Sequence, residues 1–212
     1  MGRLLFLGGL TAAYHQYDLF APVFRDLFAA VGFETDTTTD LAALNGENLS
    51  RYAAVVNYTT DREIGDAHYA ALLAFVRAGG SYLGVHCAAD TWRDQPDSKR
   101  LLGGRFVSHP PQLPVVVEIT DAAHPITRGL GSFAVFDELY MLDTEGADWH
   151  LLAQSPSVGV QPVAWWRDEG AGRVFYTSLG HNRETYAEPT FRALLGRAAA
   201  WATRTDLATV AT

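Results

Sequence analysis

Short apolar runs alternate with helical patterns through the first half of the chain. The expected strands cover 3–7, 33–38, 52–58 and 81–85. Residues 17–31 carry apolar side chains at the i, i+3, i+4 spacing of an amphipathic helix, and a second helix is expected over 66–78, before Gly79-Gly80. Strands that alternate with helices in this way form a parallel sheet with helices on both faces.

The second half of the chain favours strands. They are expected over 113–120, 133–142, 150–154, 162–167 and 173–178. A short helix over 98–102 precedes an expected active-site loop over 103–111, and a helix over 189–203 closes the chain. At this length we expect one domain over residues 1–205, with 206–212 as a frayed tail.

Two of the expected strands lead to a histidine beside a glycine. The run over 81–85 ends at His86, and the run over 173–178 leads to Gly180-His181. Ligands bind at the carboxyl ends of the strands in open α/β sheets. We therefore expect the two histidines to form the two halves of one site.

The amino-acid composition excludes several classes of binding partner. The net charge of −8 argues against nucleic acid, and with no apolar window of about 18 residues a transmembrane helix is not expected. The single cysteine, Cys87, excludes an internal disulfide and a Cys-rich zinc site. The first residues lack a signal-peptide pattern. We expect a cytoplasmic protein, a candidate homo-oligomer, that binds a small molecule rather than nucleic acid or a membrane.

Several ordered motifs resemble one family. They are Gly84-Val85-His86, Arg105-Phe106 with His109-Pro110, the D-x-x-H-P-I-T-x-G-L run from Asp121, Asp137-Glu138-Leu139-Tyr140, and the G-x-V-F-Y run that leads to Gly180-His181. Together they resemble the ThuA-like family, named after a trehalose-utilisation protein, over residues 4–201. The resemblance implies a class I glutamine amidotransferase-like fold, which is a flavodoxin-like three-layer sandwich with a mostly parallel central sheet and added antiparallel strands.

The resemblance does not imply glutaminase activity. In amidotransferases the turn after the corresponding strand is G-x-C-x-G, with the nucleophilic cysteine in third place. Here His86 occupies that place and Cys87 follows one residue later, where its side chain points in another direction. His181 looks equivalent to the amidotransferase base, but it has no cysteine to activate.

The chemistry of the two histidines has two functional interpretations. With Glu138 they form a mixed N/O ligand set for a divalent metal such as zinc, and His15 is a further candidate ligand. Alternatively, His86 and His181 act as general acid and base, and Glu138 orients one of them. Each histidine taken singly is also typical of a hydrogen-bonded plug in the core. No nucleotide cofactor is expected.

Further polar and aromatic residues are candidates for binding a substrate. They are His15, Tyr58, Asp90, Arg105, His109 and Tyr140. Strand alternation would place Glu138 and Tyr140 on one face, and aromatic rings beside carboxylates suit a sugar. Arg105 fits an ion pair with an acidic residue as well, and His109 fits a loop cap.

Three functional hypotheses follow. The first is a carbohydrate-processing enzyme that acts on a disaccharide or a keto-glycoside by His/Glu acid-base or metal-assisted chemistry. The second is a non-catalytic sugar-binding or protein-interaction module on the same scaffold. The third is a cysteine hydrolase that uses Cys87 and His181.

Overall fold

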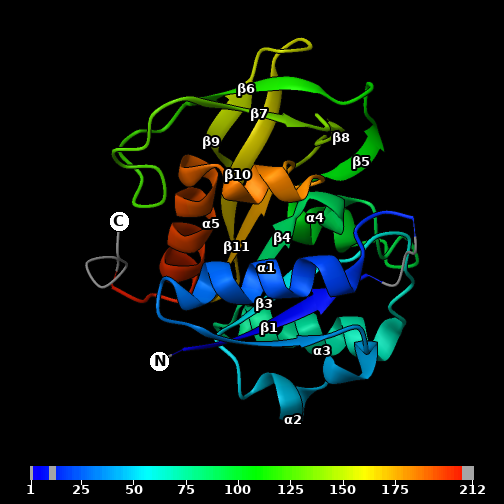
Figure 1. The fold of residues 1–212 in the computed structure, drawn as a ribbon. Coiled ribbons are helices and arrows are strands. Elements are labelled where there is room, and N and C mark those ends of the chain that lie inside the picture. The colour runs from blue at the N-terminus through cyan, green and yellow to red at the C-terminus, as the bar shows by residue number, and fades with distance from the viewer. Residues whose placement is uncertain (1, 10–12, 207–212) are drawn as a thin grey trace.

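One mixed sheet of nine strands runs through the molecule (Figure 1), in a computed structural model that describes residues 2–9 and 13–206. Its parallel half contains β1 (Arg3–Gly8), β2 (Glu34–Thr38), β3 (Ala54–Tyr58), β4 (Ser81–Val85) and β11 (Gly172–Thr177). Its antiparallel half contains β10 (Gln161–Glu169), β9 (His150–Ser155), β6 (Leu113–Ile119) and β7 (Phe133–Asp137). The strand order is β2-β1-β3-β4-β11-β10-β9-β6-β7. The expected addition of antiparallel strands to a parallel sheet is therefore confirmed.

Helices cover both faces of the parallel half. The helices α1 (Tyr17–Ala29) and α5 (Pro189–Ala202) pack on one face, where α1 buries its apolar stripe against Leu4 and Phe6. The helices α3 (Asp66–Arg77) and α4 (Ser98–Leu102) pack on the opposite face, with Leu5 and Leu7. Because successive strand residues point to opposite faces, β1 contributes to both hydrophobic cores.

One predicted strand is wrong in its extent. The run over 133–142 forms β7 and the short strand β8 (Met141–Asp143), separated by residues 138–140. The backbone N–H of Glu138 donates to the side chain of Asp137, so it is not available to a strand ladder and the chain leaves the sheet there. The strand β8 then pairs with β5 (Arg105–Ser108), which lies inside the stretch predicted as a loop.

The shorter elements complete the chain. The segment between β2 and β3, for which no element was predicted, contains the 3₁₀ turn η1 (Leu41–Ala43) and the helix α2 (Gly46–Leu49). Two further 3₁₀ turns, η2 (His86–Ala89) and η3 (Arg183–Ala187), follow β4 and β11. None of the described helices is long and apolar enough to cross a membrane. Of the predicted tail, residues 207–212 lie outside the described part of the chain; the one-domain organisation stays a prediction.

Candidate functional site

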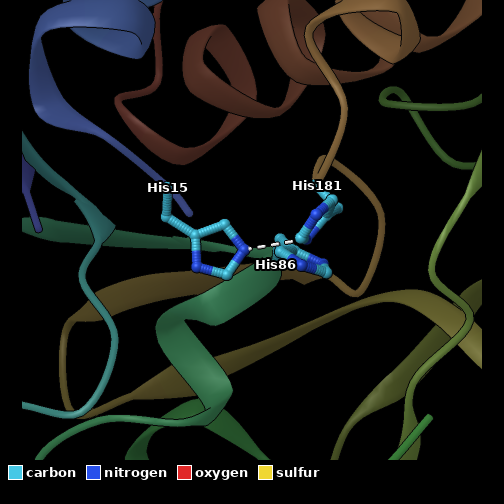
Figure 2. A group of neighbouring side chains, drawn as sticks. All are labelled: His15, His86 and His181. Carbon is cyan, nitrogen blue, oxygen red and sulfur yellow. Dashed lines mark hydrogen bonds between the residues drawn. The ribbon is translucent and has the colours of Figure 1, made fainter. Parts of the chain in front are cut away.

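Three histidines from distant parts of the sequence meet at one edge of the sheet (Figure 2). His15 lies between β1 and α1, His86 directly follows β4, and His181 follows β11. Their ring centroids are 4.9 to 5.4 Å apart. Nε2 of His15 lies 3.1 Å from Nδ1 of His181. The predicted meeting of His86 and His181 is therefore observed, and it includes His15.

The backbone around the histidines is unusual. His15 and His86 have φ angles of 53° and 46°, in the left-handed region that non-glycine residues rarely adopt. Such conformations cost about 1–3 kcal/mol each and persist where the surrounding structure imposes them. At His86 this conformation turns the chain sharply at the end of β4, and the imidazole lies wholly inside the protein.

Glu138 joins the three histidines from the segment between β7 and β8. Its Oε2 lies 3.1 Å from Nδ1 of His181 and 3.4 Å from Nε2 of His86. Its Oε1 lies 3.6 Å from Nε2 of the more exposed His109. One carboxylate therefore contacts two histidines of the cluster through one oxygen and a third histidine, nearer the surface, through the other.

Contacts within the cluster shift the pKa values of three of its members. Burial by itself would raise the pKa of Glu138, but its contacts with His181 and His86 outweigh burial and hold that pKa well below its usual range. Burial would likewise lower the pKa of His181, but the hydrogen bond and charge of Glu138 raise it. Burial and the neighbouring histidines lower the pKa of His15 to about 2. Glu138 is thus ionised and His15 neutral near pH 7.

His86 is held in one tautomer. Its Nδ1 lies 2.7 Å from the carbonyl oxygen of Ser178, so the ring donates a hydrogen there. Its Nε2 is buried and has no hydrogen-bond partner among the described residues. The ring of Tyr140 packs on the imidazole with a centroid separation of 4.1 Å. When the ring is neutral, the remaining nitrogen presents a lone pair toward Glu138.

A buried aspartate holds the segments that carry Glu138 and His181. Asp137 accepts hydrogen bonds from the backbone N–H groups of Glu138, Gly180 and His181 and from the hydroxyl of Thr185, at 2.7 to 3.0 Å. The side chain is fully buried. A buried charge is tolerated where several donors satisfy it, so this carboxylate fixes the two segments against each other.

The remaining predicted residues divide into two groups. His109 and Tyr140 lie at the cluster, with their rings in contact. The buried Tyr58 packs against the cluster: its hydroxyl donates to the carbonyl of Gly180, and its ring makes a T-shaped contact with His15. Arg105 and Asp90 make side-chain contacts elsewhere, Arg105 with Ser98 and Asp90 with Arg93. A substrate role for Arg105 and Asp90 stays a prediction.

Sequence reasoning missed Asp137 and Ser178 as partners of the site. Asp137 was recognisable as an acidic residue at the end of an apolar run, directly before Glu138. No sequence signal marks Ser178, because its contribution to His86 is a backbone carbonyl that any residue supplies. Glu138 and Tyr140 both contact His86, but they lie in the segment between two strands rather than within one strand.

Cys87 is not part of the cluster. Its thiol is fully buried in the core on the side of α1 and α5. Burial raises the pKa of this thiol well above its usual value, so the reactive thiolate is disfavoured. The geometry agrees with the sequence argument that His86, and not the cysteine, occupies the strand-end turn.

Comparison with known proteins finds one family model, described as ThuA, trehalose utilisation, which matches residues 3–202. No curated protein matches by sequence. A ThuA-like protein of Bacteroides uniformis is 24% identical over 95% of this chain and 91% of its own, with a TM-score of 0.79. A ThuA-like protein of Parabacteroides merdae is 20% identical over 95% and 90%, with a TM-score of 0.84. A β-galactosidase of Bacillus circulans sp. alkalophilus is 12% identical over 97% of this chain but only 31% of its own, with a TM-score of 0.68.

Proposed function

Because the chain belongs to the ThuA family, described as trehalose utilisation, we propose that it is an enzyme that processes a carbohydrate. The substrate class is a disaccharide or a keto-glycoside, and the reacting groups are His86, His181 and Glu138. The observation that carries the proposal is the Glu138 carboxylate placed 3.1 Å from His181 and 3.4 Å from His86 at the carboxyl ends of parallel strands. That is the edge of an α/β sheet where ligands bind.

The cluster can assist a reaction at a sugar in two ways. A histidine paired with a carboxylate exchanges protons near neutral pH, and His181, whose side chain is partly exposed, is the member of the pair that a substrate reaches. A divalent metal on the same side chains would instead polarise a hydroxyl or carbonyl oxygen of the sugar. In both cases Glu138 orients His181, and Asp137 holds the backbone of both residues in place through their N–H groups.

Aromatic groups beside the cluster support a sugar ligand. Tyr14 is 46% exposed and its ring meets His15 edge-on with a centroid separation of 5.0 Å. Phe106 and His109 pack on Tyr140 on the side of the β5–β8 pair. Flat rings beside hydrogen-bonding groups suit a sugar, which has both apolar C–H faces and a polar edge.

Glutaminase activity is not proposed. The thiol of Cys87 is fully buried, and its raised pKa disfavours the reactive thiolate. The parallel strands follow the order β2-β1-β3-β4-β11, which corresponds to the flavodoxin-like order. We accordingly also propose the flavodoxin-like, amidotransferase-like description of the fold. We also propose a small-molecule ligand rather than nucleic acid, a choice that the net charge of −8 supports.

A non-catalytic sugar-binding module is the second candidate function. It is favoured by one observation: the β-galactosidase of B. circulans contains this fold as 31% of its chain. A scaffold that serves as one part of a larger sugar enzyme is compatible with binding or assembly roles as well as with catalysis.

The test is turnover of trehalose, other disaccharides and their keto derivatives, followed by chromatography, with calorimetric binding in parallel. Wild-type turnover should be abolished in His86→Ala and His181→Ala and retained in His68→Ala, a matched histidine on α3 outside the cluster. Turnover unchanged in the two cluster variants would overturn the proposed reaction centre. Binding of these sugars without turnover would favour the module.

A further inference from the structure

Four potential ligand atoms converge in the cluster. They are Nε2 of His15, Nε2 of His86, Nδ1 of His181 and Oε2 of Glu138. One ligating atom from each of the three histidines lies within 4.8 Å of the others. The members come from four separate segments of the chain, so the fold itself assembles the set.

The two short contacts of His181 cannot both be hydrogen bonds from one ring nitrogen. Nδ1 of His181 lies 3.1 Å from both Nε2 of His15 and Oε2 of Glu138. A single ring nitrogen either donates one hydrogen or accepts, so neutral rings cannot make both contacts strong hydrogen bonds. A cation placed between the three atoms would be attractive to each of them.

His86 gives the strongest indication. Nδ1 donates to the carbonyl of Ser178, so in the neutral ring Nε2 is a buried lone pair 3.4 Å from a carboxylate oxygen of Glu138. Nε2 has no hydrogen-bond partner within residues 2–9 and 13–206. An unpaired buried acceptor that faces a negative charge is costly, and a metal ion between the two atoms would remove that cost.

The separations also match those between ligands of one ion. Two ligands at about 2.0–2.1 Å from a tetrahedral metal are about 3.3–3.4 Å apart, and the right-angle pairs of an octahedral metal about 3 Å apart. The three contacts of the cluster are 3.1, 3.1 and 3.4 Å. The three histidine atoms lie within 4.8 Å of one another, and Glu138 is joined to them by its contacts with His181 and His86. Side-chain rotations that close the longer separations would bring the four atoms around one metal.

The surroundings resemble the outer shell of a metal centre. Metal-binding histidines usually donate their second ring N–H to a carbonyl or carboxylate, as His86 does to Ser178. Asp137 holds the backbone at Glu138 and His181. Three imidazoles with one carboxylate suit zinc or another first-row divalent metal, whereas Mg²⁺ and Ca²⁺ prefer all-oxygen sets.

We propose that His15, His86, His181 and Glu138 together bind one divalent transition-metal ion, zinc or a similar ion. This goes beyond the proposed carbohydrate reaction, because a metal can bind whichever substrate the protein takes. It also assigns a role to His15, whose Nε2 lies 3.1 Å from Nδ1 of His181.

Metal binding is tested on the full chain after dialysis against a chelator. Zinc is titrated by competition with a chromogenic chelator, and Co²⁺ is titrated by its visible absorption. We expect one ion per chain, with neither Mg²⁺ nor Ca²⁺ in competition. Glu138→Gln and His15→Gln should each weaken zinc binding by more than the roughly 10–100-fold that loss of an outer-shell partner produces. His68→Ala should bind as the wild type does.

Circular dichroism on each variant separates loss of a ligand from loss of the fold, and the near-isosteric Glu138→Gln remains informative if a histidine variant unfolds. Absence of stoichiometric zinc and Co²⁺ binding, or wild-type affinity in folded Glu138→Gln and His15→Gln, would overturn the inference. Metal binding without sugar turnover would leave this inference standing and remove the proposed function. Sugar turnover in a protein that binds neither zinc nor Co²⁺ would do the reverse.

Discussion

Replacing Asp137 by asparagine should destabilise the protein and loosen the site. The buried carboxylate faces four donors: on Oδ1 the N–H groups of Glu138 and His181, and on Oδ2 the N–H of Gly180 and the hydroxyl of Thr185. Asparagine has nearly the same shape, but one of its two polar ends is an NH₂ donor. Wherever that end lies, it meets two donors.

The least costly arrangement places the NH₂ group at the Oδ2 position. The hydroxyl of Thr185 can rotate and accept there, but the N–H of Gly180 loses its acceptor. A hydrogen bond to a charged group contributes about 1.5–3 kcal/mol, and an unsatisfied buried donor costs about 1–3 kcal/mol. With the two retained bonds also weakened by loss of the charge, we expect a loss of about 3–5 kcal/mol, out of the roughly 5–15 kcal/mol of a typical domain.

Urea unfolding at pH 7 measures this loss in Asp137→Asn. The control is Thr185→Val, which removes one hydroxyl donor to Asp137 and leaves the three backbone bonds in place. It should cost about 1.5–3 kcal/mol. Zinc affinity should fall in Asp137→Asn and stay near the wild-type value in Thr185→Val. Asp137→Asn within 1 kcal/mol of the wild type would refute the reasoning.

Three further predictions concern positions away from the ligand atoms. Burial opposes ionisation of Glu169, but hydrogen bonds from three arginines hold its pKa at about 2. The contribution of ionised Glu169 to the stability of the fold is therefore complete above the ordinary pKa of 4.5 and is lost as the pH falls toward 2. Glu169→Gln, which leaves the buried Arg167 with less negative charge, should cost about 3–5 kcal/mol at pH 7 and less at pH 3 in urea unfolding; an equal cost at both pH values would contradict this. Gly180→Ala, at φ +120° and with its Cβ 2.5 Å from the hydroxyl of Tyr186, should lower the melting temperature more than an alanine at a positive-φ glycine with free space around it. The thiol of Cys87 should react with an aromatic disulfide reagent only after unfolding, and rapid reaction of the native protein would revive the cysteine-hydrolase hypothesis.

Local patterns predicted the elements that local forces dominate. The amphipathic spacing over 17–31 corresponds to α1 (Tyr17–Ala29), and the apolar run before His86 to β4 (Ser81–Val85). The pattern was wrong over 133–142, where the Asp137 side chain takes the Glu138 N–H and ends the strand. The pairing of β5 with β8 was also missed, because it joins segments more than 30 residues apart and depends on tertiary contacts.

The sequence by itself determined which chemistry the protein carries. It placed His86 and His181 at strand ends that a parallel sheet must bring to one edge. Only the tertiary structure decided how these groups face one another. The contact between His15 and His181, which are 166 positions apart, is set by packing. Packing and partners such as the Ser178 carbonyl also set the left-handed turn at His86 and the tautomer of its ring. Strand periodicity indicates where a side chain emerges, but the direction and protonation of an imidazole depend on neighbours that the chain supplies only when folded.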